Sequence, residues 1–436
     1  MPEVMDNVIS LAKRRGFIFA SSEIYGGING FWDYGPVGVE LKRNIKEFWW
    51  KSMVASRNDM VGVDTSIICH PQTWVASGHV ASFSDPMTDC RECKKRFRTD
   101  DVTGKKCPAC GGELTEARQF NLMFQTNVGA AVDAASVAYL RPETCQSIFT
   151  NFKTIQITSR QKIPFGIAQI GKSFRNEITP RNFIFRSREF EQMEMEFFIK
   201  PDVAEGETWY KYWIERRQQW FFDIGIRKDK MRLRPHAADE LAHYALGCTD
   251  VEYQFPFGWS ELEGIANRGN FDLSQHAKFS GKDLSYFDEA AKEKFVPAVI
   301  ESSVGVDRTL LTVLVDAFVE EEAPTGEGGT EVRTVLKLHP RLSPYKAAVF
   351  PLVKKLSEPA LKLTKSMQAH FPTDFDDGSS IGKRYRRHDE IGTPFGITYD
   401  HQSAEDQKVT IRERDSMRQE RVGIDQVINY VRDRLA

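Results

Sequence analysis

Between residues 186 and 198, polar and apolar side chains alternate with the period of a β-strand. One face would carry Arg186, Arg188, Phe190, Gln192, Glu194 and Glu196, and the other Met193, Met195 and Phe197. The apolar face predicts packing against a core. Because glutamate is a poor strand former, carboxylates at alternate positions indicate either a solvated face with ion pairs or a ligand site. The strand alone leaves both interpretations open.

The segment before it favours the ligand site. Residues 169–177 predict a preceding strand and residues 178–185 a connecting loop. This pair would place Arg175, Glu177 and Arg181 beside the polar face. Arginine forks bind phosphate, an aromatic ring stacks on a base, and carboxylates accept an amino group or a metal. The pattern is therefore typical of a nucleotide site.

Helical and strand periods also organise the rest of the chain. They predict a helix and the start of a strand within residues 1–19, a helix that begins at Pro36, and a helix over 204–225. Residues 255–266 predict a strand with Glu261 and Glu263 on one face. Residues 296–319 predict a strand, a glycine turn and a buried helix.

The distribution of Pro, Gly and acidic residues divides the chain into two domains. Residues 320–330 are acidic and rich in Pro and Gly, which favours a linker, placed at 326–334. We expect a domain over 1–325 and a separate α/β domain over 335–436, where helical and strand patterns alternate.

Composition describes an ordinary globular protein of 436 residues, with 41% hydrophobic and 28% charged residues. The formal net charge of −2 argues against indiscriminate coating of nucleic acid, but it permits a local basic patch. Such a cluster occurs once, at Lys383, Arg384, Arg386 and Arg387. No signal peptide or membrane-spanning run is present, so we expect no membrane association and a cytoplasmic location.

Four cysteines have the spacing of a metal site: Cys90, Cys93, Cys107 and Cys110 form C-x2-C-x13-C-x2-C. This spacing predicts a zinc ribbon within residues 86–116, with structural Zn²⁺, because four thiolates leave no open position on the metal. Reduced thiols or disulfides are the alternatives. Cys69, Cys145 and Cys248 show no pairing signal, and we expect small buried side chains.

Several strings resemble one family. FRNE at 174–177 and FRSREFEQME at 185–194 are similar to motif 2 of class II aminoacyl-tRNA synthetases, in the version of the homodimeric glycyl-tRNA synthetases. ESSVGVDR at 301–308 resembles motif 3, and residues 23–54 resemble motif 1. YLRPETCQSIF and GWSELEGIANR resemble further family strings. The sequence departs from the family at Cys145, Ser147 and Ser302.

The resemblance implies an α+β fold: an antiparallel catalytic domain with a ribbon-like insertion, followed by an α/β anticodon-binding domain. It implies a glycine–tRNA ligase that activates glycine with ATP and Mg²⁺ and then charges tRNA-Gly, acting as a homodimer. The basic cluster at 383–387 would meet tRNA phosphates. Exposed Trp49 and Trp50 would suit the dimer interface.

The resemblance also implies site residues. The ATP site comprises Arg175, Asn176, Glu177, Phe185, Arg186, Ser187, Arg188, Glu189, Phe190, Glu261, Leu262, Gly305, Val306, Asp307 and Arg308. The glycine site comprises Arg98, Glu143, Phe190, Glu191, Gln192, Met193, Glu194, Glu301, Ser302, Ser303, Val304 and Gly305. Arg175, Arg308 and Glu301 would be catalytic, and Arg268 would lie on the phosphate side.

Two other classes of function remain as alternatives. One is a catalytically inactive synthetase-like accessory protein that binds nucleic acid, against which the complete set of signature arginines and carboxylates argues. The other is a sister synthetase for threonine, proline or histidine. A four-cysteine ribbon and the ELEG and EFEQME strings favour glycine over these.

Overall fold

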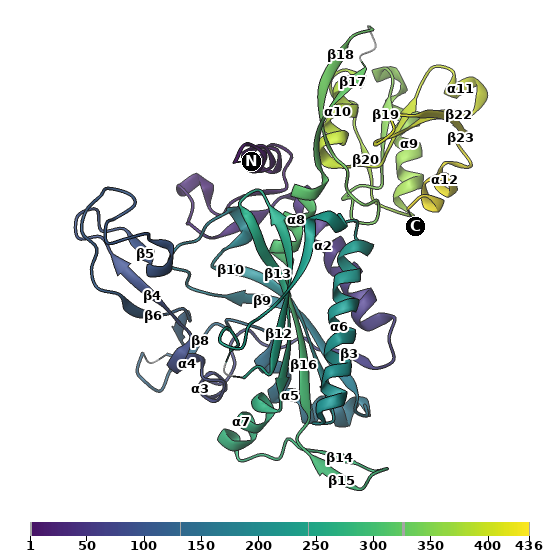
Figure 1. Cartoon of the computed structure of the whole chain (residues 1–436). Coiled ribbons are helices and arrows are strands. Elements are labelled where there is room, and N and C mark those ends of the chain that lie inside the picture. Colours follow the sequence, from purple (N-terminus) through teal and green to yellow (C-terminus); the bar gives the residue numbers. More distant parts are fainter. Residues whose placement is uncertain (1, 131, 243, 325–327, 436) are drawn as a thin grey trace.

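The larger, N-terminal part of the chain is built on one seven-stranded sheet (Figure 1). The computed structural model describes residues 2–130, 132–242, 244–324 and 328–435. The strand order is β11-β12-β13-β16-β10-β9-β3, and every neighbouring pair is antiparallel except β3 and β9. The strands are β3 (Met60–Gly62), β9 (Phe165–Phe174), β10 (Glu189–Ile199), β11 (Met231–Pro235), β12 (Gly247–Phe255), β13 (Gly258–Gly269) and β16 (Ala298–Gly305).

Helices cover the two faces of this sheet unequally. The main core lies between one face and α1 (Pro2–Arg14), α2 (Pro36–Trp50), α6 (Val203–Asp223) and α8 (Val306–Ala317). The predicted alternation in β10 is confirmed, since Met193, Met195 and Phe197 belong to this core. On the other face, α5 (Cys145–Ser159) and α7 (Phe271–Ser280) cover only one end. The polar side chains of β10 therefore face a partly open side.

A β-bulge changes one prediction. Val251 pairs with Glu263 and Glu252 pairs with Glu261, so Leu262 is the extra residue of β13. An extra residue reverses the side-chain alternation. Glu261 and Glu263 therefore do not share a face: Glu261 borders a cavity, whereas Glu263 is buried and pairs with Arg217 of α6 at 2.6 Å.

The helix that begins at Pro36 is confirmed, but its tryptophans are not exposed. Trp49 is completely buried in the main core. Trp50 is half-buried and packs so closely on β3 that a Cβ at Gly62 would lie 2.3 Å from its ring. The exposed apolar side chain of this helix is instead Val39.

Small elements surround the sheet. The four-cysteine segment extends from a three-stranded sheet that projects from the domain, in the order β5-β4-β6 (Figure 1). Its strands are β4 (Ser84–Asp89), β5 (Arg96–Arg98) and β6 (Arg118–Asn121). Three hairpins join β1 (Ile18–Ala20) to β2 (Trp32–Tyr34), β7 (Gln125–Asn127) to β8 (Val137–Tyr139), and β14 (Tyr286–Asp288) to β15 (Glu293–Phe295). Two short helices are α3 (Gln72–Ala76) and α4 (His79–Ser82).

The C-terminal region has its own sheet and core. The order is β20-β19-β21-β22-β23, with β19 (Ala347–Pro351), β20 (Thr373–Phe375), β21 (Phe395–Tyr399), β22 (Lys408–Glu413) and β23 (Gln419–Gly423). Its helices are α9 (Ser357–Gln368), α10 (Ile381–Ile391), α11 (Ser403–Asp406) and α12 (Val427–Asp433). No helix among the described residues is long and apolar enough to cross a membrane.

Two paired strands lead into this region. β17 (Phe318–Pro324) and β18 (Thr330–Leu336) form an antiparallel ribbon that rises beside α10 (Figure 1). Residues 330–334 of the predicted linker thus lie in a strand. Residues 326 and 327 of that linker, and the domain boundary predicted at 325, fall outside the described residues.

Candidate active site

Two cavities adjoin on the open face of the large sheet. The first, of about 130 Å³, is lined by Arg175, Glu177, Ile184, Phe185, Arg186, Ser187, Phe190, Gln192, Glu261, Leu262, Ser303, Gly305, Asp307 and Arg308. The second, of about 260 Å³, contains the carboxylates Glu143, Glu194 and Glu301. Arg175, Gln192, Glu261 and Ser303 line both. A molecule extending from one cavity into the other would pass these four side chains.

Aromatic rings and arginines alternate in the first cavity. The Arg175 guanidinium lies 5.3 Å from the centre of the Phe190 ring, and its Nε donates to the Pro142 carbonyl at 3.0 Å. The Arg308 guanidinium lies 4.5 Å from the Phe185 ring and forms an ion pair with Glu261 at 3.3 Å. Flat cationic and aromatic surfaces beside one another suit a base and its phosphates.

Glu194 is the most firmly held carboxylate of the second cavity. The Thr144 N–H donates to it at 2.9 Å, Gln192 at 2.9 Å and the Ser303 hydroxyl at 2.6 Å, and the Thr144 hydroxyl donates as well. Burial, together with nearby Glu143, raises its pKa. Because these donors fix both oxygens, Glu194 presents a preorganised acceptor to the cavity.

Arg268 binds two carboxylates within the second cavity. It forms a bidentate pair with Asp272, at 2.7 and 2.8 Å, and contacts Glu301 at 2.7 Å. Its guanidinium also lies 3.9 Å from the Tyr244 ring. Arg268 lines the second cavity and not the first, and the structure places it beside Glu301.

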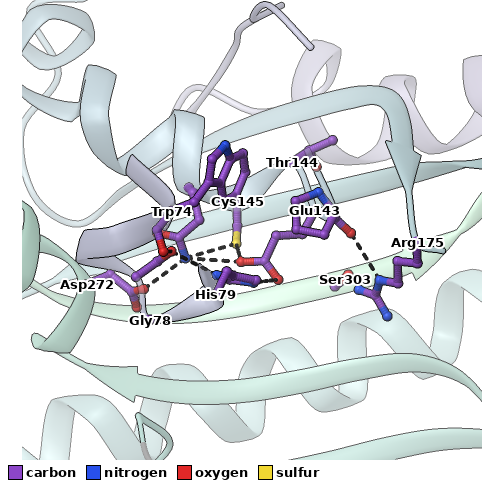
Figure 2. Close-up of polar contacts among 12 residues, drawn as sticks. Trp74, Gly78, His79, Glu143, Thr144, Cys145, Arg175, Asp272 and Ser303 are labelled. Atoms are coloured by element: carbon purple, nitrogen blue, oxygen red, sulfur yellow. Dashed lines mark hydrogen bonds and ion pairs between the residues drawn. The ribbon is translucent and has the colours of Figure 1, made fainter. Parts of the chain in front are cut away.

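Glu143 lies beside a histidine that sequence reasoning missed. His79, at the start of α4, is 3.4 Å from Glu143, and the Cys145 thiol donates to the same carboxylate at 3.0 Å (Figure 2). Burial alone would raise the pKa of Glu143, but His79 and Arg268 hold it well below its usual range. Glu143 is therefore ionised at neutral pH. Cys145 fits this arrangement as a buried donor.

Glu196 is buried without a hydrogen bond. Neither carboxylate oxygen has a partner in the described part of the chain, and Glu196 pairs directly across the sheet with Glu301. Burial and the charge of Glu301 raise the pKa of Glu196 well above its usual range. Burial also raises the pKa of Glu301 to about 7, although Arg268 opposes this shift. The two carboxyl groups thus carry fewer than two negative charges near neutrality.

Eleven of the fifteen predicted ATP residues line the first cavity. The side chains of the other four lie elsewhere: Asn176 and Arg188 border a separate hollow, Glu189 pairs with Lys172, and Val306 belongs to the core.

Of the twelve predicted glycine residues, Glu143, Gln192, Glu194, Glu301 and Ser303 line the second cavity, while Phe190 and Gly305 line the first. The other five have side chains outside both cavities: Arg98 pairs with Asp85, Glu191 pairs with Lys42 and Lys46, Met193 and Val304 are core residues, and Ser302 donates to buried Glu263. Strand alternation explains four of these five. Glu191, Met193, Ser302 and Val304 each lie one residue from a position that faces a cavity, so their side chains leave the opposite face of the sheet.

Other cavity residues were missed because they come from a segment without a periodic signal. They are His236, Glu240, Ala242, Ala245, Cys248 and Asp250. Predicting β12 beside β13 would have found Cys248 and Asp250, since both follow the alternation of that strand. His276 is confirmed as a satisfied polar residue, bonded to Gln146 at 2.9 Å.

The four predicted metal-ligating cysteines converge. Cys90 and Cys110 sulfurs are 3.5 Å apart, and those of Cys93 and Cys107 are 3.7 Å apart. All four sulfurs lie within 4.8 Å of one another. Two sulfurs bound to one tetrahedral zinc lie roughly 3.8 Å apart. The cluster therefore has the composition and dimensions to hold such an ion.

The basic cluster of α10 is mostly used within the protein. Arg384 is buried and donates to the carbonyls of Pro351, Asp377, Gly378 and Ser379. Arg386 and Arg387 pair with Glu331 and Asp376. Lys383 is exposed and forms no ion pair within the described part of the chain. Arg384 cannot contact phosphate without unfolding this region.

Fold and site together define a class II aminoacyl-tRNA synthetase. Residues 132–317 match the family model "tRNA synthetase class II core domain (G, H, P, S and T)", and residues 346–434 match "Anticodon binding domain". A solved chain titled as the RNA binding domain of threonyl-tRNA synthetase from Cryptosporidium parvum has a TM-score of 0.69 over 97% of both chains. At 18% identity, that similarity concerns the fold alone.

Comparison with curated proteins shows which family within this class of synthetases the chain belongs to. The glycine–tRNA ligase of Streptomyces coelicolor is 53% identical over 99% of this chain and 98% of its own length. The enzyme of Thermobifida fusca is 53% identical over 100% of this chain, and that of Caldanaerobacter subterraneus is 52% identical over 99%. The chain belongs to the glycine–tRNA ligase family.

Proposed function

We propose that the protein activates glycine with ATP and transfers the glycyl group to the 3′ end of tRNA-Gly. The observation that carries this proposal is the junction of the two cavities at Arg175. One cavity offers rings and arginines to a nucleotide, and the other offers carboxylates to an ammonium group. A carboxylate bound at the junction would lie beside the α-phosphate, which is the geometry that adenylation requires.

Arginines supply charge stabilisation in the first step. The glycine carboxylate attacks the α-phosphate and pyrophosphate leaves. Arg175 stabilises charge at the α-phosphate, and Arg308 contacts the leaving phosphates. Phe190 stacks on the adenine. Mg²⁺ would add further positive charge at the phosphates. Glu261 would hold it, because this half-exposed carboxylate borders the nucleotide cavity and offers the hard oxygen donors that Mg²⁺ prefers.

Carboxylates select the amino acid. Glu194 and Glu301 bind the ammonium group, and Glu143 adds a third negative charge to the cavity. Glycine has no side chain to grip, so larger amino acids must be rejected by contact with the cavity wall. In the second step the ribose hydroxyl of tRNA attacks the carbonyl carbon of the glycyl-adenylate, its ester bond forms, and AMP leaves, so that no covalent protein intermediate is needed.

Three further features belong to the proposal. The four-cysteine cluster holds structural Zn²⁺, supported by its sulfur spacing. Two chains associate through the region of residues 23–54, supported by the exposed apolar side chains Ile24, Tyr25 and Val39 within it. The protein acts in the cytoplasm, where tRNA is charged for translation. Sedimentation of the purified protein tests the dimer.

Amino-acid-dependent exchange of pyrophosphate into ATP tests the activation step. We expect exchange with glycine and none above background with alanine, serine, threonine or proline. Charging of tRNA-Gly by the same preparation tests the second step. Absence of glycine-dependent exchange in folded, zinc-replete protein would favour the accessory-protein alternative.

A further inference from the structure

A mixed donor cluster borders the second cavity, and its members do not line the first. His236 Nδ1 or Nε2, Cys248 Sγ and an Asp250 carboxylate oxygen lie within 4.8 Å of one another, and all three residues line the cavity. None of them has a part in the proposed binding of glycine or ATP.

The sheet ladder brings these donors together. Cys248 and Asp250 occupy alternate positions of β12, so their side chains leave the same face. His236 directly follows β11, and its N–H donates to the Cys248 carbonyl at 2.9 Å. Two adjacent strands, and not a mobile loop, therefore fix the three side chains relative to one another.

The donor set has a specific chemistry. An imidazole nitrogen, a thiolate and a carboxylate are together typical ligands of zinc, whereas Mg²⁺ prefers oxygen donors alone. Three protein donors leave a fourth tetrahedral position open, and here it would face the cavity. We propose that His236, Cys248 and Asp250 bind one divalent cation of the zinc class, as a site distinct from the four-cysteine cluster.

The geometry needs only a small adjustment. His236 Nε2 lies 2.8 Å from Asp250 Oδ2, so this pair is already in contact. Bonds of about 2.0–2.3 Å place tetrahedral ligand atoms up to roughly 3.8 Å apart, so about 1 Å of side-chain movement closes the widest separation. Asp250 is buried, while His236 and Cys248 are half-buried. A cation can therefore approach from the cavity.

Neighbouring charges do not oppose the cation strongly. Arg234 is the nearest arginine on β11, but it pairs with Glu240 at 3.1 Å and with Glu252 at 3.5 Å. Glu261, on the neighbouring strand β13, adds negative charge, and burial together with this charge raises the pKa of Asp250. The surroundings are therefore acidic overall.

Binding has a proton cost. Burial and Asp250 raise the pKa of Cys248 to about 12, so the cation must displace the thiol proton, which leaves to solvent. Affinity should be lower than at the four-cysteine cluster, because the cavity offers one thiolate where the cluster offers four. The cluster of four cysteines fills first, and the cavity site fills second.

Cobalt(II) added to zinc-replete protein tests this directly. Cobalt bound to a thiolate gives a charge-transfer absorption that a site of oxygen and nitrogen lacks. We expect this absorption with one cobalt per chain in the wild type, its loss in Cys248→Ala, and its retention in Cys69→Ala. Cys145→Ala is the matched control, because Cys145, Glu196 and Glu301 form another three-donor group in the cavity region.

Protection of the thiol gives a second measurement that needs no variant. Added zinc should slow alkylation of Cys248 in the wild type by at least tenfold, measured by mass spectrometry, while alkylation of Cys69 continues at its usual rate. Absence of the cobalt absorption, its persistence in Cys248→Ala, its loss in Cys145→Ala, or unchanged alkylation of Cys248 would each overturn the proposal. Failure of glycine-dependent exchange would leave it unaffected.

Discussion

Arginine has opposite roles in the two halves of this molecule. In the catalytic half, Arg175 and Arg308 come from separate elements and project into a cavity. In the C-terminal half, three arginines lie within four residues of α10, yet Arg384 is buried and the other two pair with carboxylates. A dense run of arginines in the sequence thus does not show that their side chains are free to bind a ligand. Arg175, directly after β9, and Arg308, in the first turn of α8, are free to do so because both border a cavity.

The largest expected effect concerns Arg175. Arg175→Ala should lower glycine-dependent pyrophosphate exchange by about 10²–10³-fold, the usual effect of removing one preorganised donor to developing charge. The fold should survive, because within the described part of the chain the guanidinium donates one hydrogen bond, to the Pro142 carbonyl, and otherwise lies over the rings of Phe83 and Phe190. Arg181→Ala is the matched control: it lies in the same connection, pairs with Asp101, and lines neither cavity. Equal losses in both variants would contradict a specific role.

Arg384→Ala should act on stability instead. It leaves the buried carbonyl of Pro351 without its donor and removes three further bonds, to the carbonyls of Asp377, Gly378 and Ser379, at a cost on the order of 3 kcal/mol. Hydrogen exchange of β19 and β21 should accelerate about 100-fold, while β10 keeps its protection. Glycine-dependent exchange at 25 °C should be unchanged. Unaltered protection of β19 would show that Arg384 is dispensable to this core.

The same distinction explains what sequence could and could not predict. The strand, glycine turn and helix around Gly305 were predictable because period and turn chemistry are local. The bulge at Leu262 was not, since an extra residue is defined only by its partner strand. It reversed the assigned face of Glu263. The burial of Arg384 could not be predicted either, because its guanidinium is held by backbone carbonyls of β19 and of the loop before α10, and the local sequence pattern does not encode these contacts.

The third prediction concerns the pH dependence of glycine activation, which we expect to follow the titration of Glu301. Because burial raises the pKa of Glu301 to about 7, this group becomes protonated below that pH and loses its attraction for the ammonium group of glycine. We expect kcat/KM for glycine to fall up to tenfold per pH unit below about pH 7 and to level off above it. Exchange kinetics measured on both sides of neutrality check this.

Two variants show whether Glu301 or the neighbouring Glu196 causes the break near pH 7. Glu301→Gln should lower kcat/KM and abolish the break near pH 7. Glu196→Gln should preserve the break and change kcat/KM little, because Glu196 lines neither cavity and burial with the nearby Glu301 raises its pKa and so disfavours its charged form. A break that disappears in Glu196→Gln would assign the titration to Glu196.

The smallest effect should come from Lys383, the one member of the α10 cluster that is exposed. If it meets a tRNA phosphate, Lys383→Ala should weaken tRNA binding a few-fold and reduce the slope of log affinity against log salt by about 1. Glycine-dependent exchange should not change. Lys365→Ala, an equally exposed lysine on α9, provides the control for net charge. Indistinguishable salt slopes in the two variants would mean that α10 contributes no phosphate contact, and its basic sequence would then be wholly structural.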